Sequence, residues 1–358
     1  MARIAPDAVP ATQPLLALGA SVIWAALLPV LGWLDVHGWI LLHSLILGVF
    51  GNAAVGAALQ FGSAVLGFPR LFPTVGWAAV LAVFNVGVLM MLMGPVFGWP
   101  EMRVIGSPWV VAALWALITP LIIGLARSSG PSAVRFPLAV GFLGLGLAAL
   151  LGAFRLWGEE LPGGLAAHRG MGIALGLGGV VLGASRLLLP TLTGVIWRNV
   201  LRLEWPFRRR PELGLAWLLG GAMALMALLM QVTLRPGADE MLPPMVIAGA
   251  IALVVPATAL PITAFLHWWR LRQRVPRGRQ VPGIDRLLPS PVIGAWLALR
   301  VVALAIWGLA IGRSDVQSLR QGALVAESLA ATALLIAFLL PAWRARRFRL
   351  TVPSTELT

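Results

Sequence analysis

Residues 107–126, SPWVVAALWALITPLIIGLA, form a stretch of 20 residues without a single charged side chain. An α-helix rises about 1.5 Å per residue, so a run of this length crosses the ~30 Å hydrocarbon core of a bilayer. The stretch therefore has the length and composition of a membrane-spanning helix, and comparable runs recur along the chain.

Ten apolar runs of this kind alternate with short segments rich in Pro, Gly, Ser or charge. They cover residues 14–34, 40–66, 75–97, 107–126, 136–157, 168–192, 213–234, 244–267, 290–312 and 321–342. We therefore expect an all-α, polytopic transmembrane helix bundle of about ten spans. Residues 1–342 would form a single transmembrane domain and 343–358 a cytoplasmic C-terminal tail. Within the domain, 14–126 and 136–267 read as diverged four-span repeats and 290–342 as an extra hairpin.

The composition supports a membrane protein. Of the 358 residues, 59% are hydrophobic and 11% are charged, and the mean hydropathy is +0.90. Soluble domains carry roughly a quarter charged residues, so most of this surface must face lipid. No loop between the runs is long enough for a soluble catalytic domain. Any function is expected inside the bilayer or through partners.

The basic residues predict the orientation. All 27 are Arg. Nineteen lie in the N-terminal tail, the loops after even-numbered runs and the C-terminal tail, against six on the opposite side and two, Arg186 and Arg300, within runs. This asymmetry predicts both termini in the cytoplasm of a bacterial inner membrane. The Arg clusters are explained by contact with an anionic leaflet, so no nucleic-acid partner is expected.

Missing residue types exclude several chemistries. Without Cys the chain offers no disulfide and no thiolate nucleophile or metal ligand. Without Lys it cannot form a Schiff base, which rules out a retinal protein of the usual kind.

His43 and His168 are the main candidate site residues. Each lies near the start of a predicted span, and the two spans run in the same direction, so both imidazoles are expected at similar depth near the outer face. Ionisable groups at this depth are functional candidates because burying them without a partner is costly. Helical spacing places small residues below each ring: Gly51 and Ala54 follow His43, and Gly176 and Gly179 follow His168. Such stripes suit either close helix packing or a flat macrocycle.

The segments headed by these histidines resemble a known family. HSLILGVFGNAAVGAALQFGSAVLG at 43–67 and HRGMGIALGLGGVVLGASRLLLPTLTG at 168–194 are similar to segments of haem–copper oxidase subunit I-like membrane proteins, a group that includes the NnrS-type proteins. The resemblance implies a b-type haem near the outer face, with His43 in the position of the family's ligand and His168 as the next candidate. Arg155 and Arg169 would then pair with haem propionates, unless they are ordinary interfacial arginines.

The departures from this family are as informative. An oxidase of the group needs about six His and a Tyr beside its metals. This chain has four His and no Tyr. We therefore expect no copper centre and no oxygen reduction, but one haem b used in electron transfer or gas-ligand sensing. The sequence does not decide whether the protein is an enzyme, and it leaves open a redox partner or other subunits of a membrane complex.

Other residues support alternative readings. His37 beside Asp35 is either a loop residue or a replacement ligand, and His267 reads as an interfacial anchor. Arg300 and Glu327 are expected to form an intramembrane ion pair, which is either structural or part of a proton or ion pathway. Together with the prolines of the eighth run, this pair favours a secondary transporter as the alternative function. A scaffold subunit of a larger complex is a third reading.

Overall fold

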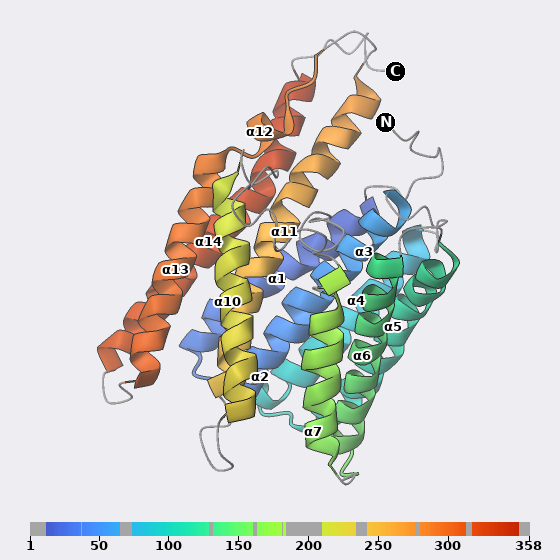
Figure 1. The fold of residues 1–358 in the computed structure, drawn as a ribbon, viewed down its shortest axis with the longest axis vertical. Helices are drawn as coiled ribbons and strands as arrows, with labels where there is room; N and C mark the ends of the chain where they lie inside the picture. Colours follow the sequence, from blue (N-terminus) through green and yellow to red (C-terminus); the bar gives the residue numbers. More distant parts are fainter. Residues whose placement is uncertain are drawn as a thin grey trace. The chain divides into compact units, whose positions relative to one another are not determined.

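The chain is described by a computed structural model, and every secondary-structure element in its described part is a helix. The described residues are 12–36, 38–64, 74–128, 132–159, 163–180, 182–183, 210–233, 242–275, 280–312 and 317–350. The chain divides into two compact units, one built from residues 1–17 and 54–205 and the other from residues 18–53 and 206–358. Figure 1 shows the helices of both units, and each unit is described by itself below.

Eight helices in the described part are long and apolar enough to cross a membrane. They are Thr12–Trp33, Gly38–Gln60, Val75–Met93, Glu101–Arg127, Ser132–Leu156, Ala248–Arg274, Ser290–Ala310 and Gln317–Arg349, and Pro211–Ala227 is a shorter apolar helix. Large apolar side chains such as Ile23, Leu218 and Leu309 are 60% or more exposed. Exposed apolar area on this scale suits a helix bundle solvated by lipid. The ten-span count and the orientation stay predictions.

Unit 1 contains antiparallel helices that pack in chain order. They are α3 (Asn52–Ala64), α4 (Thr74–Met93), α5 (Glu101–Arg127), α6 (Ser132–Leu156), α7 (Gly164–Arg169) and the π-helix η3 (Gly170–Leu177). The short 3-10 helix η2 (Pro95–Phe97) and Gly98, whose φ of 80° favours glycine, make the turn from α4 to α5. From α4 onwards each helix packs against the next: α4 against α5, α5 against α6, and α6 against α7 and η3.

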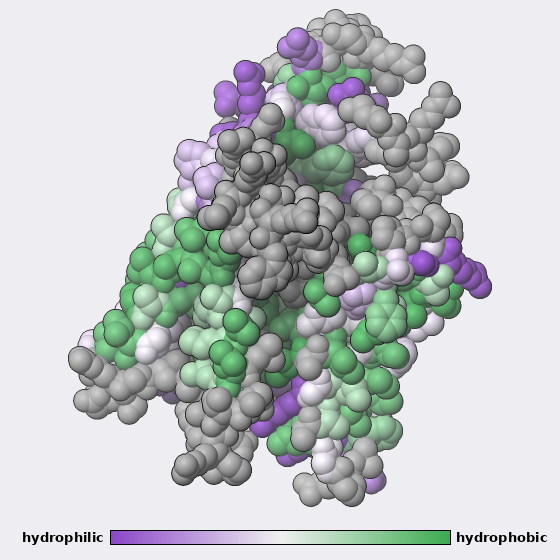
Figure 2. All heavy atoms as spheres, in the orientation of Figure 1, coloured by the Kyte–Doolittle hydropathy of each residue, from purple (hydrophilic) through white to green (hydrophobic). Residues whose placement is uncertain are grey.

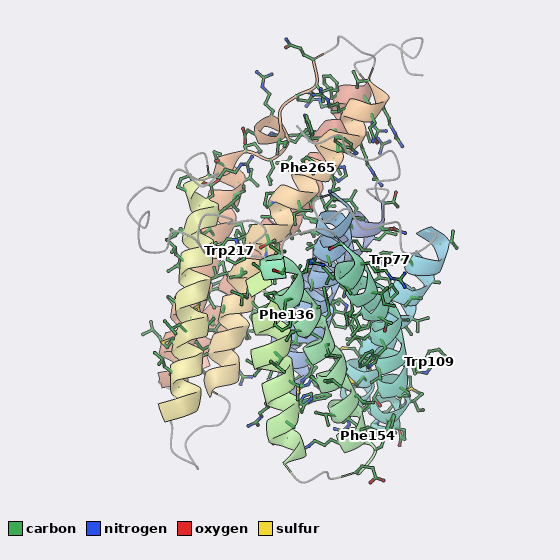
Figure 3. The ribbon with its side chains drawn as sticks, turned by 45° about the vertical axis from the view of Figure 1, so that its right-hand side comes forward. Trp77, Trp109, Phe136, Phe154, Trp217 and Phe265 are labelled. Carbon is green, nitrogen blue, oxygen red and sulfur yellow. The ribbon has the colours of Figure 1, made fainter. Side chains whose placement is uncertain are left out.

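Small residues set how closely these helices approach. A Cβ added at Gly106 of α5 would lie 2.7 Å from the carbonyl oxygen of Gly87 in α4. Near one end of the unit, Nε1 of Trp157 donates to the hydroxyl of Ser107 at 3.0 Å, which ties the end of α6 to the start of α5. Figure 3 shows Phe136 and Phe154 towards opposite ends of α6. Close packing through small residues is the usual way in which lipid-embedded helices associate.

Unit 2 is organised around a central helix. It contains α1 (Thr12–Trp33), α2 (Gly38–His43), the π-helix η1 (Ser44–Gly51), α10 (Pro211–Thr233), α11 (Leu242–Arg274), α12 (Ile284–Leu287), α13 (Ser290–Gly312) and α14 (Gln317–Leu350). The helix α11 contacts α10, α13, α14 and η1, and 72% of its membrane-spanning window is buried. Pro256 and Pro261 lie inside it, where each removes a backbone donor from the helical ladder.

The hairpin of α13 and α14 completes unit 2. Trp33 at the end of α1 donates from Nε1 to the hydroxyl of Ser328 at 3.2 Å, and Asp35 pairs with Arg320 near the start of α14. The helix α14 continues to Leu350, eight residues past the expected end of the last span at 342. Hydrophilic residues gather where α11, α12 and α14 end, whereas the flanks of α10 and α13 are mostly hydrophobic (Figure 2).

Candidate functional site

His43 is held by its own helix. Its Nδ1 lies 2.9 Å from the carbonyl oxygen of Trp39, one turn earlier in α2, and the Trp39 ring lies 4.6 Å away between centroids. A carbonyl oxygen can only accept, so Nδ1 must carry the hydrogen and donate it. In the neutral ring this leaves the lone pair on Nε2, the nitrogen through which such an imidazole binds a metal.

A π-helical segment follows His43 directly. It covers Ser44–Gly51. Two side chains donate hydrogen bonds to backbone carbonyls of this segment. The hydroxyl of Ser21 donates to the carbonyl of Val49 at 2.8 Å, and the amide of Asn52 donates to the carbonyl of Gly48 at 2.6 Å. Gly48 also admits the indole of Trp24 from α1, because any Cβ there would collide with it. π-Helical insertions in α-helices occur frequently at functional sites.

His168 is held by a neighbouring helix. Its Nδ1 lies 2.8 Å from the carbonyl oxygen of Ala148 in α6, so this ring also donates from Nδ1 and has its lone pair on Nε2 when neutral. The ring packs on Gly152, where an added Cβ would lie 2.9 Å from Cε1 of His168. Arg155 and Arg169 lie close enough to act on this imidazole electrostatically. The two arginines predicted to accompany His168 are thus grouped with it in unit 1.

The two histidine segments share a local architecture. In both, a six-residue α-helix, Gly38–His43 or Gly164–Arg169, leads into an eight-residue π-helix that returns to α-helix. His43 is the last residue of its short helix and His168 the last but one. This likeness goes beyond the small-residue pattern, and the internal repeat stays a prediction.

The helix α6 fills the space beside the glycines that follow His168. An added Cβ at Gly179 would lie 2.7 Å from Cα of Gly141 in α6, and one at Gly176 would lie 2.8 Å from the Leu145 side chain. Of the two alternatives for this stripe, the structure therefore gives helix packing. These contacts bring η3 and the residues that follow it against α6. A role of Gly176 and Gly179 in contacting a haem stays a prediction.

The remaining candidates near the histidines are divided between the units. Gly51 and Ala54 are both buried. His43 belongs to unit 2 and His168 to unit 1, so a shared iron between them stays a prediction. His37 and Arg186 lie outside the described residues. In the described part, no three His, Cys, Asp or Glu side chains are grouped to hold a metal ion; two axial imidazoles would be enough for haem iron.

Arg300 and Glu327 form an ion pair in unit 2. Nη1 of Arg300, at the middle of α13, donates to Oε2 of Glu327 in α14, and the two side chains are 5% and 16% exposed. The predicted contact between the two helices is thus present.

His267 adjoins Trp268 on α11. The Cζ atom of Arg272 lies over the Trp268 ring, 5.5 Å from its centroid, and this arrangement is typical of an interfacial anchor.

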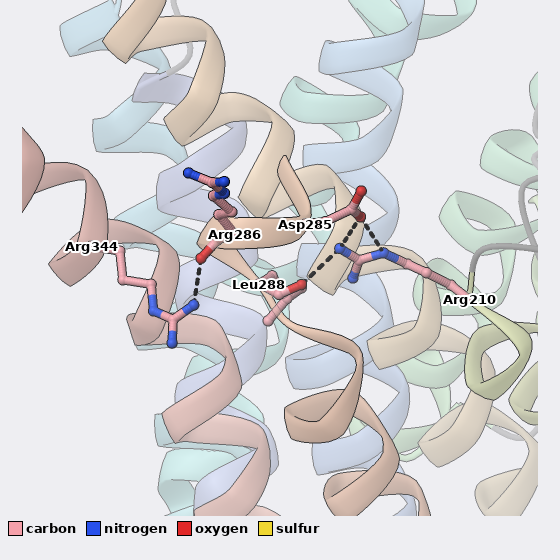
Figure 4. Close-up of polar contacts among 5 residues, drawn as sticks. All are labelled: Arg210, Asp285, Arg286, Leu288 and Arg344. Atoms are coloured by element: carbon pink, nitrogen blue, oxygen red, sulfur yellow. Dashed lines mark hydrogen bonds and ion pairs between the residues drawn. The ribbon is translucent and has the colours of Figure 1, made fainter. Parts of the chain in front are cut away.

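A group of ionic and hydrogen-bonding contacts at one end of unit 2 was not predicted from the sequence. The side chain of Arg210, which immediately precedes α10, is 9% exposed and donates to Asp285 of α12 at 2.7 Å and to the carbonyl of Leu288 at 2.7 Å (Figure 4). Arg344 of α14 donates to the carbonyl of Arg286. For the cluster 208–210 the sequence predicts only contact with an anionic leaflet. Asp285, an acidic residue in the loop before the ninth run, is the available signal in the sequence.

Comparisons with known proteins do not identify a family. No family model, curated protein or solved structure gave a significant match.

Proposed function

We propose that the protein is a membrane-embedded haem b protein of the bacterial inner membrane, with His43 and His168 as axial ligands. The proposal rests on one observation: the two imidazole rings make the same kind of hydrogen bond. Each donates from Nδ1 to a backbone carbonyl, at 2.9 Å and 2.8 Å, which orients the ring and favours ligation through Nε2. Each also adjoins a π-helical segment.

The haem would supply one-electron exchange at its iron, or an iron-centred response to a gas. The chain's part is to hold the rings and to tune the site. The Ala148 carbonyl fixes the orientation of the His168 ring by accepting its Nδ1 hydrogen, and Arg155 and Arg169 are suited to carboxylate groups because guanidinium binds them in a bidentate manner. The donor set suits bis-imidazole ligation, and no copper centre is part of the proposal.

An absorption spectrum tests this function. We expect purified protein, produced with ample haem, to give a b-type spectrum after dithionite reduction. His43→Ala and His168→Ala should each change the spectrum and lower the haem content, because each removes one axial ligand. His267→Ala is the matched control, since it deletes an imidazole from an interfacial position, and it should leave the spectrum unchanged. A colourless wild-type preparation would remove the haem proposal.

A secondary transporter is the second candidate. Its support is the buried Arg300–Glu327 pair beside a central helix that contains Pro256 and Pro261. A colourless protein would make this the leading reading. The scaffold alternative has no residue of its own in support.

A further inference from the structure

The helix α13 buries two hydrogen-bond donors that lack acceptors. Trp296 is fully buried and Arg300 is 4% exposed. Within the described part of the chain, neither Nε1 of Trp296 nor Nε of Arg300 has a hydrogen-bond partner. The residues are four apart, so both side chains lie on one face of α13, one turn from each other. Buried donors without partners are rare and costly, and two on one face indicate that an acceptor belongs there.

The surroundings of this face are almost free of charge. Leu304, one turn beyond Arg300, lies against Gly249 of α11, which places the face towards the centre of unit 2. In the described parts of α10, α11, α13 and α14, every other charged or titratable side chain lies towards a helix end. These are Glu212, His267, Arg270, Arg272, Arg274, Arg320, Arg344, Arg346, Arg347 and Arg349. The Arg300–Glu327 pair is therefore the charged group at the centre of these helices.

The pair leaves donors of Arg300 for a second ligand. A guanidinium has five N–H groups, and only Nη1 is engaged with Glu327. The edge that contains Nε–H can bind a planar oxyanion through two parallel hydrogen bonds. The indole N–H of Trp296 would supply another donor from the preceding turn. The missing acceptor thus has the chemistry of a small oxyanion.

We propose that Arg300, Trp296 and Glu327 form a proton-coupled binding site for a small monovalent oxyanion. Without the anion, the charges of Arg300 and Glu327 cancel. An anion added to this pair would leave a net negative charge in the membrane, which is strongly disfavoured. Uptake of one proton by the Glu327 carboxylate restores neutrality.

The charge balance defines the loaded state. Glu327 accepts one proton from water and becomes a neutral carboxylic acid, while Arg300 stays protonated and binds the anion through the edge that contains Nε–H. The site gains one proton and one negative charge, so it is neutral before and after binding. A divalent anion would leave the same site charged. The charge balance therefore selects a monovalent ligand. This inference is independent of the haem proposal.

Nitrate is a suitable probe because it is planar and monovalent and does not itself take up a proton near neutral pH. We expect nitrate added to the purified full-length protein, in weakly buffered detergent solution with a pH indicator, to cause uptake of about one proton per bound anion, since neutrality of the site requires one. Sulfate should cause none. Absence of nitrate-dependent proton uptake by the wild-type protein would overturn the proposal.

Variants separate the three roles. Glu327→Gln should bind nitrate in calorimetry without proton uptake, because Gln mimics the protonated acid. Arg300→Gln should abolish binding. Trp296→Phe keeps the aromatic volume and loses one donor, so we expect affinity about tenfold lower. Asp35→Asn, which removes the exposed pair with Arg320, is the control and should behave as wild type. Proton uptake that persists in Glu327→Gln, or unchanged affinity in Trp296→Phe, would contradict the assignment even if Arg300→Gln does not fold.

Discussion

At the scale of single residues, several buried or partly buried polar side chains are held by backbone carbonyls or by ion pairs. His43 and His168 each donate to a carbonyl, and Arg300 donates to Glu327. These contacts offset the cost of removing polar groups from water. They also fix the orientation of the groups, which is what a ligand site requires.

The contact between His168 and Gly152 gives a test that leaves both histidines in place. Gly152→Ala adds a Cβ that would lie 2.9 Å from Cε1 of His168, so the ring must shift. If His168 is an axial ligand, the substitution should lower haem content or change the spectrum. Gly170→Ala is the matched control because a Cβ there meets nothing within 4 Å. Equal haem loading and identical spectra in both variants would argue against ligation by His168.

The ion pair predicts a non-additive effect on stability. Arg300→Met leaves Glu327 without its partner, and loss of one member of a buried pair typically costs about 3–5 kcal/mol. Arg300→Met combined with Glu327→Met should be clearly more stable than the single variant, because no charge is then left at membrane depth. Thermal unfolding in detergent, followed by size-exclusion chromatography, would measure both. A double variant less stable than the single one would contradict a paired role.

At the scale of helices, small residues decide which helices meet. Gly176 of η3 and Gly179, two residues past its end, lie against α6 at backbone distance. Each His therefore depends on different packing: His43 on its own helix and on η1, and His168 on α6.

Gly179→Ala should loosen the contact between α6 and η3. The new Cβ would lie 2.7 Å from Cα of Gly141, and neither backbone can yield without a shift, so we expect a loss of about 1–3 kcal/mol of stability. Gly178→Ala is the control, because its Cβ would lie 3.6 Å from its closest neighbour, the Ile173 carbonyl oxygen. Thermal unfolding of the two variants makes the comparison, and equal midpoints would show that the close approach is absent.

The helices could be predicted from the sequence because long apolar runs have few other solutions in lipid. The contact of Arg300 with Glu327 was also accessible, since it follows from the rise per residue of two consecutive antiparallel helices. The partner of the glycine stripe was not, because sequence spacing alone cannot tell a neighbouring helix from a cofactor. The contact of His168 with Ala148 and the π-helical segments arise from tertiary packing, for which local sequence gives no signal.

At the scale of the whole molecule, the chain is a multi-pass helical membrane protein with two compact units, and eight helices in its described part are able to span a membrane. Charge asymmetry extends this to a proposed ten-span arrangement with both ends in the cytoplasm.

The absence of Cys makes this topology directly testable. Single cysteines replacing Trp99, which is exposed between α4 and α5, and Arg346, which is exposed on α14, provide one probe for each predicted side. In intact spheroplasts, a membrane-impermeant maleimide should label the cysteine at position 99 and not the one at position 346. Both should react after lysis. Labelling of the two positions from the same side would exclude the predicted orientation.

The proposed haem site requires that two imidazoles on different segments bind one iron, and electron paramagnetic resonance of the oxidised, haem-loaded protein tests this requirement. We expect a low-spin signal typical of bis-imidazole ligation in the wild-type protein, replaced by a high-spin signal or by loss of haem in both His43→Ala and His168→Ala. A low-spin signal that survives in either variant, or a wild-type protein that never binds haem, would contradict it.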